Sequence, residues 1–156
     1  MANNRKWKFK VDFKQTLTSK TELLNDLFDR WENTIPEYQG KFVKDGIVDE
    51  QLFAFAQTKV LFIAKEPNNP NQDAGDFREW WRDEIAYTFS YRIAEWSYGL
   101  LNNFPQYDDI WANKGFAHKA IQSIAFMNIK KSGGLGNSEY DRMLEHLEKN
   151  FDFLHQ

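Results

Sequence analysis

Cysteine is absent from the 156 residues of this chain. Its absence excludes disulfides, thiolate zinc sites, cysteine-bound iron–sulfur clusters and thiol nucleophiles. It suits a reducing compartment, and no apolar block follows the basic N-terminus as a secretory signal requires, so we expect a cytoplasmic protein. His118, His146 and His155 have no second ligand at metal spacing, and we therefore expect no metal and no cofactor.

Long apolar runs are missing as well. No stretch approaches the roughly 18 apolar residues that a membrane span needs, so we expect no membrane partner.

The net charge of −3 argues against a general polyanion binder, because nucleic-acid-binding domains commonly carry a basic face. Aromatic residues, in contrast, reach 17%. They predict an aromatic-rich core, with the stacking of some rings on nucleic-acid bases as the alternative.

Buried strands are predicted at two apolar segments. Lys59–Ala64 contains a continuous apolar run, which predicts burial on both faces, as in the central strand of a parallel or mixed sheet. Ser123–Ile129 is the second predicted strand and is also apolar. A third segment, Trp7–Phe13, alternates apolar with polar side chains and predicts a strand or an extended arm.

Helix signals separate these strands. Ser19 and Glu22 have the spacing of a capping box, and Pro36 ends the helix that follows. Gly40–Gly46 is expected to be a loop. The other predicted elements are a helical turn over Gln51–Ala56, a long helix from Asp76 to Leu101, a helix over Lys114–Gln122 and a last helix capped by Ser138.

The alternation of strands and helices predicts an α/β fold with a central, mostly parallel sheet. Residues 1–156 are expected to form a single domain. Two core strands make a poor sheet by themselves. Either Trp7–Phe13 joins the sheet, or the chain is the N-terminal portion of a longer domain, and the strand count favours the second interpretation.

The candidate site follows from this fold, because ligands bind beyond the carboxyl ends of the strands in open α/β sheets. Lys65–Pro70 and Asn128–Gly134 leave those ends, and they open on one crevice if the strands are parallel neighbours. Glu66, held by the rigid Pro67, could orient or deprotonate a water molecule there. The alternative is a solvated loop glutamate, or one that is paired with Lys65.

Polar residues also follow the second strand. The side-chain amide of Asn128 can read the edge of a base, although asparagine also commonly ends strands in turns. The next residues combine lysines with small side chains, which favours a bound phosphate but lacks the spacing of a Walker loop. They are Lys130, Lys131, Ser132 and Gly133.

These two segments resemble motifs of the uracil-DNA glycosylase superfamily. In that family an apolar strand runs into Gly-Gln-Asp-Pro, Gly-Glu-Ala-Pro or Gly-x-Asn-Pro, and Ala64-Lys65-Glu66-Pro67 is similar. A second family strand ends in an asparagine, as Ala125-Phe126-Met127-Asn128 does. The family's second catalytic motif, a His-Pro-Ser-type loop, comes after two further strands, which agrees with an N-terminal portion of the fold.

The resemblance implies a glycosylase-like α/β fold of three αβα layers, and a DNA-repair hydrolase that cleaves the N-glycosidic bond of a flipped base. Glu66 would orient the attacking water, Asn128 would hold the base, and an aromatic ring from residues 77–81 would stack on it. Lys65, Pro67 and Asn68 would complete the substrate site, and the expected partner is DNA or a nucleotide. The alternatives are a non-catalytic nucleotide- or nucleic-acid-binding module, and an enzyme acting on a nucleotide or sugar phosphate through residues 130–134.

Overall fold

The central sheet has the strand order β2-β5-β3 in the computed structural model, which describes residues 19–112, 114–134 and 139–156. Strand β5 (Ala125–Asn128) pairs in parallel with β3 (Leu61–Ala64) and antiparallel with β2 (Gly46–Ile47). A separate parallel pair joins β1 (Val43–Lys44) to β4 (Gly75–Asp76). The fold is therefore α/β, as predicted, but the central sheet is mixed.

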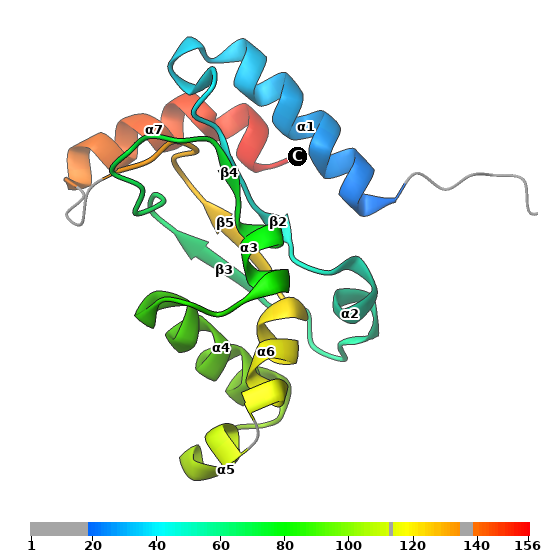
Figure 1. The fold of residues 1–156 in the computed structure, drawn as a ribbon. Coiled ribbons are helices and arrows are strands. Elements are labelled where there is room, and N and C mark those ends of the chain that lie inside the picture. The colour runs from blue at the N-terminus through cyan, green and yellow to red at the C-terminus, as the bar shows by residue number, and fades with distance from the viewer. Residues whose placement is uncertain (1–18, 113, 135–138) are drawn as a thin grey trace, which may run out of the picture.

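Helices lie on both sides of this sheet (Figure 1). On one side lie α1 (Lys20–Thr34) and α7 (Tyr140–Leu154), and on the other lie α3 (Phe77–Asp83), α4 (Thr88–Leu101) and α6 (Lys114–Gln122). The remaining helices are α2 (Glu50–Phe55), α5 (Tyr107–Ala112) and the 3-10 turn η1 (Pro36–Tyr38). Within the described ranges, no helix has both the length and the apolar character to cross a bilayer.

The capping box predicted at Ser19 is confirmed. The Ser19 hydroxyl accepts a hydrogen bond from the Glu22 amide at 3.1 Å, and the Glu22 carboxylate accepts one from the Ser19 amide at 2.8 Å. Together these bonds satisfy two donors that an uncapped helix would leave free. The helix predicted over Lys114–Gln122 is confirmed with the same bounds.

The long helix predicted from Asp76 to Leu101 is wrong, because the backbone becomes extended at Glu84 and divides it into α3 and α4. In one straight helix, Trp81 and Ile93 would lie about 18 Å apart along the axis. The break brings both into a single hydrophobic cluster with Phe126. Packing around the sheet therefore overrides the helical periodicity of this segment.

The prediction that β3 is buried on both faces is also wrong. Phe62 and Ala64 pack against the core, but Leu61 and Ile63 are 52% and 61% exposed. Burial of both faces needs a packed layer on each side, and the core clusters of the described residues include neither Leu61 nor Ile63. Leu61 lines an open apolar groove of about 530 Å³ between the sheet, α1 and the end of α7.

Three further predictions concern segments with weak patterns. Gly40–Gly46 contains β1 and the first residue of β2, so it is not simply a loop; strands of two residues have no detectable periodicity. Trp7–Phe13 and Ser138 lie outside the described residues. The last helix has Glu139 at its N-cap position.

Aromatic rings form much of the core, which confirms that part of the prediction. On the side of α3, α4 and α6, Trp81 and Phe126 lie with ring centroids 4.8 Å apart. On the side of α1, Trp31, Tyr38 and Phe42 form a second buried cluster. The first cluster packs against β3 and β5, and the second lies under α1 with Phe153 and Leu154 at the end of α7.

Candidate functional site

The two segments predicted to form the site lie side by side. Strands β3 and β5 are parallel neighbours, as expected, with Ala64 in register with Asn128. Their pairing continues past the strand ends, so the two segments run together instead of separating into an open crevice. The hydrogen bonds that continue the pairing are Ile129 N to Ala64 O (3.0 Å), Lys130 N to Lys65 O (2.9 Å) and Gly134 N to Pro67 O (2.8 Å).

Glu66 pairs with Lys130. The Lys130 ammonium lies 2.9 Å from the Glu66 carboxylate, and the two side chains are 18% and 10% exposed. The same ammonium donates a hydrogen bond to the Gly133 carbonyl at 3.1 Å. The carboxylate also lies directly against Gly134, where an added Cβ would fall 2.0 Å from the Glu66 Cδ atom. A glycine at residue 134 thus leaves room for the carboxylate.

Asn128 is 1% exposed and has an unusual hydrogen-bond pattern. Its main-chain N–H donates to the Asp45 carboxylate at 2.8 Å, and its side-chain Nδ2 lies 3.5 Å from the same oxygen. The side-chain Oδ1 is buried and has no hydrogen-bond partner within residues 19–112, 114–134 and 139–156. Because buried polar atoms are nearly always paired in proteins, this acceptor is a candidate contact for a ligand.

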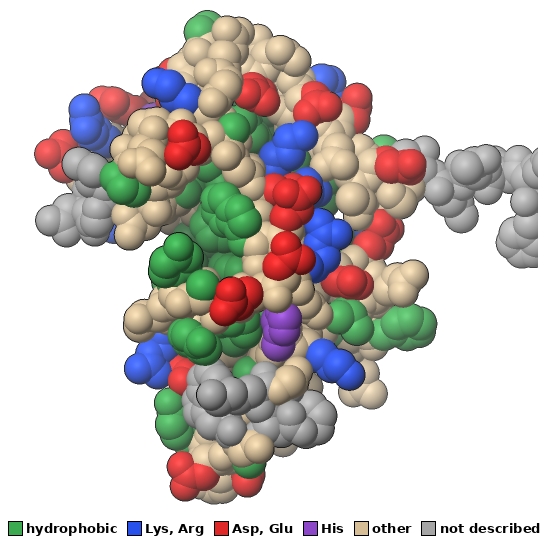
Figure 2. Space-filling model, in the orientation of Figure 1, with side chains coloured by type: hydrophobic (Ala, Val, Ile, Leu, Met, Phe, Trp, Pro, Cys, Tyr) green, Lys and Arg blue, Asp and Glu red, His purple; other side chains and the backbone are tan. Residues whose placement is uncertain are grey.

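The register places Asn128 and Ala64 on one face of the sheet, and Glu66 follows Ala64 past a bend at Lys65. Side chains alternate along a strand, so Phe126 and Asn128 share one face, and Ala64, level with Asn128, lies on that face too. Glu66 comes two residues after Ala64. The ring of Phe77 contacts Phe126 with centroids 5.1 Å apart, which brings an aromatic ring from the predicted region to this face. Figure 2 shows hydrophobic side chains gathered between the upper and lower helices, beside a column of charged ones.

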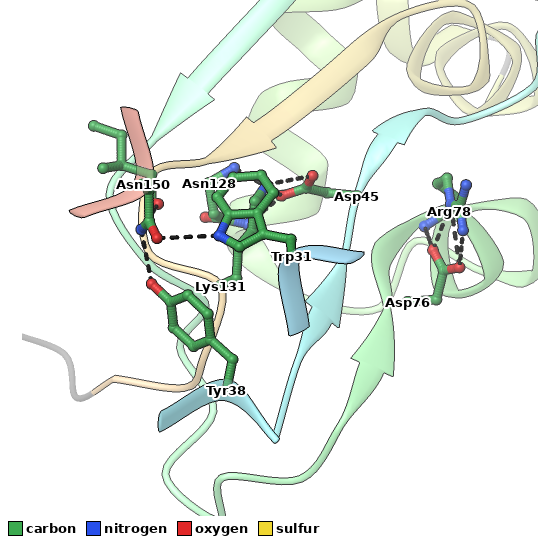
Figure 3. Close-up of polar contacts among 9 residues, drawn as sticks. Trp31, Tyr38, Asp45, Asp76, Arg78, Asn128, Lys131 and Asn150 are labelled. Carbon is green, nitrogen blue, oxygen red and sulfur yellow. Dashed lines mark hydrogen bonds and ion pairs between the residues drawn. The ribbon is translucent and has the colours of Figure 1, made fainter. Parts of the chain in front are cut away.

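Lys131 lies in a different environment from Lys130 (Figure 3). It is 0% exposed, and its ammonium lies 2.6 and 2.7 Å from the two Asp45 carboxylate oxygens. The same ammonium lies 4.9 Å from the ring centre of Trp31. Burial lowers the pKa of Lys131 and raises the pKa of Asp45, and the attraction between the two charges opposes both shifts.

The predicted phosphate loop is therefore corrected. Lys131 cannot reach a phosphate while it is enclosed with Asp45, and Lys130 already binds Glu66. Ser132 is 5% exposed, and the carbonyl of Gly133 accepts hydrogen bonds from Gln72 and Lys130. The loop thus directs its polar groups into the protein.

The remaining predicted residues surround Glu66. Lys65 and Asn68 are exposed, while Pro67 is buried and its carbonyl binds Gly134. Sequence reasoning missed Asp45, which links Asn128 to Lys131. The signal was present as an acidic residue within the mostly apolar stretch from Phe42 to Val48, but nothing in the sequence identified its partner.

Comparisons add no independent assignment: no protein-family model, curated protein or solved structure matches the chain significantly. Within the described part of the chain, no three His, Asp or Glu side chains are grouped so that they could hold a metal ion. What the site can do must therefore be argued from its geometry. That geometry consists of a buried amide oxygen without a hydrogen-bond partner among the described residues, an aromatic ring on the same face of the sheet, and a carboxylate in the segment that follows the neighbouring strand.

Proposed function

We propose that this protein is a uracil-DNA glycosylase-like hydrolase that binds a flipped base beside Asn128 and cleaves its N-glycosidic bond with a water molecule oriented by Glu66. The observation that carries the proposal is the buried Oδ1 of Asn128, which has no hydrogen-bond partner among the residues that the structure describes. A base that offers an N–H group to this oxygen would supply the missing hydrogen bond. Helices on both sides of the sheet support the three-layer arrangement that the resemblance implies.

Glu66 suits the role of orienting water. Glu66 follows β3, the strand that pairs with β5, and β5 ends in Asn128. Contacts with Lys130 and Gly134 fix the position of the Glu66 carboxylate. A fixed carboxylate can accept a hydrogen bond from water and stabilise positive charge that develops on the sugar as the glycosidic bond breaks. Phe77, which packs on Phe126, is the ring best placed to stack on the base. Because Asn128 is 1% exposed, the side chains around it must shift to admit a base.

Release of uracil from a single-stranded oligonucleotide with one deoxyuridine tests this proposal. We expect release by the wild type and a reduction of roughly 10²–10⁴-fold in Glu66→Gln, the usual contribution of a positioned acid or base. Asp26→Asn is the matched control, since its carboxyl belongs to an exposed pair on α1. No release by the wild type would remove the hydrolase proposal, and equal release by Glu66→Gln would remove the role of Glu66.

A non-catalytic base-binding module is the second candidate. The observation in its favour is that Glu66 already has Lys130 as a partner, which competes with a water molecule for the carboxylate. Titration of the same oligonucleotide separates the candidates, because a module would bind it without releasing uracil. The third candidate, an enzyme acting on a sugar phosphate through residues 130–134, loses its main support because Lys131 is enclosed.

A further inference from the structure

We infer that Asp45 is a positioning residue that fixes the orientation of the Asn128 amide and so selects bases with an N–H donor next to a carbonyl, as in uracil. This inference rests on the proposed function, in which Asn128 reads the base. It concerns a residue that does not itself touch the ligand. Asp45 contacts Asn128 twice, at the main-chain N–H (2.8 Å) and at the side-chain Nδ2 (3.5 Å).

The orientation follows from electrostatics. An asparagine amide has a donor end and an acceptor end of nearly the same shape, so its surroundings decide which end points where. With Nδ2 toward Asp45, a partly positive N–H group faces a carboxylate. Turned around, Oδ1 of Asn128 would face the same carboxylate oxygen, and two acceptors would lie together in a buried site. Asp45 therefore holds Nδ2 on its own side and turns Oδ1 away.

Asp45 can do this only if its carboxylate is ionised and immobile. Lys131 provides both conditions through its contacts with the two carboxylate oxygens, and the side chains of the pair are each 1% exposed. Trp31 and Phe28 enclose the ammonium, with ring centres 4.9 and 5.6 Å away. Figure 3 shows the resulting chain of contacts, from Lys131 through Asp45 to Asn128. Asp45, between β1 and β2, thus places a fixed carboxylate next to the Nδ2 end of the Asn128 amide.

Because Nδ2 is held toward Asp45, a bound base would meet Oδ1 of Asn128 as the acceptor. Uracil presents an N–H flanked by carbonyls, which matches Oδ1 together with the second hydrogen on Nδ2. Cytosine presents a ring-nitrogen acceptor beside an amino group, which matches the amide only after it turns around. The charge on Asp45 disfavours that turn, and it therefore disfavours cytosine.

The test compares binding of two oligonucleotides, with one 2′-fluoro-2′-deoxyuridine or one 2′-fluoro-2′-deoxycytidine, in which the fluorine resists loss of the base. The variant is Asp45→Asn with Lys131→Met, which removes both buried charges together and lets residue 45 face either end of the amide. Asp45→Ser with Lys131→Met is a second variant with a smaller polar group. Tyr38→Phe is the control for a disturbance of the core around Lys131, since its hydroxyl binds Asn150 and the main chain of Lys131 while both buried charges stay in place.

We expect wild type and Tyr38→Phe to prefer uracil over cytosine by roughly 10- to 100-fold, the range that one well-paired base edge provides. Both double variants, checked for folding by thermal unfolding, should lose most of that preference, chiefly through tighter binding of cytosine. A folded double variant that keeps the wild-type preference overturns the role of Asp45 and leaves the proposed function standing. A wild type without preference overturns base reading by Asn128, and the role of Asp45 with it.

Discussion

Lys130 and Lys131 are adjacent in the sequence, and each binds one carboxylate, but their environments differ sharply. Lys130 pairs with Glu66 where 18% and 10% of the two side chains remain exposed. Lys131 pairs with Asp45 where each side chain is 1% exposed. The backbone bends at Ile129 and Lys130, after the end of β5, and Lys130 lies beside Glu66 while Lys131 enters the core under α1. The comparison teaches that two lysines in adjacent positions can form one ion pair that solvent still reaches and one that is enclosed in the core.

The largest effect that this comparison predicts is on stability. Lys131→Met should lower the free energy of unfolding by about 3–5 kcal/mol, because it leaves the buried Asp45 carboxylate without its counter-charge. Urea denaturation measures the loss. The double variant Asp45→Asn with Lys131→Met removes both charges and should recover most of the stability. A loss no greater than that of Lys130→Met would contradict the difference between the two pairs.

The pH dependence of Lys131→Met should show the same buried charge. Burial raises the pKa of Asp45 above its ordinary value of 3.8, so the folded protein binds a proton at a pH where the unfolded chain does not. This group therefore stabilises the fold fully below pH 3.8, and that contribution is lost as the pH rises through the raised pKa. We expect the stability gap between Lys131→Met and the double variant to narrow on acidification. A gap that widens on acidification would show that Asp45 is not the group responsible.

Gly133 and Gly134 offer a smaller and more selective comparison. An alanine Cβ at residue 133 would lie 2.1 Å from the main-chain oxygen of Asn69, so the backbone must move and we expect a cost of about 1–3 kcal/mol. At residue 134 the Cβ would meet the carboxyl end of the Glu66 side chain, which can swing away at less cost. Gly134→Ala should therefore cost less stability than Gly133→Ala but should lower the rate of uracil release, because it displaces the Glu66 carboxylate. Thermal unfolding measures the stability of both variants, and the release assay measures their rate of uracil release. If both variants lost the same stability and the same release rate, the different roles of the two glycines would be contradicted.

The smallest expected effect is that of Lys130→Met. Its ion pair with Glu66 is partly open to solvent, and pairs of this kind contribute about 1 kcal/mol or less. Urea denaturation in low and high salt tests this, because salt screens a partly exposed pair more than a buried one. A loss as large as that of Lys131→Met, with no dependence on salt, would show that solvent does not reach the pair.

Local signals accounted for the elements that short-range chemistry defines. The Ser19 capping box, the helix over Lys114–Gln122 and the apolar segment of β5 were readable because each depends on neighbours within a few residues. The parallel pairing of β3 with β5, expected from the fold class, was confirmed. The break at Glu84 and the exposed face of β3 were not readable, because packing and strand order decide them.

For the candidate site, the sequence alone predicted that Glu66 and Asn128 follow two buried strands, because strand ends can be read from apolar runs that stop, whereas the neighbouring position of the two strands was an assumption that the structure confirmed. Only the tertiary structure decided that Lys130 would bind Glu66, and that Lys131 would be buried with Asp45, 86 residues away in the chain. The physical reason is that an ion pair depends on distance and burial in space. Neither quantity is encoded by residues next to one another, so two consecutive lysines with the same local pattern received different partners.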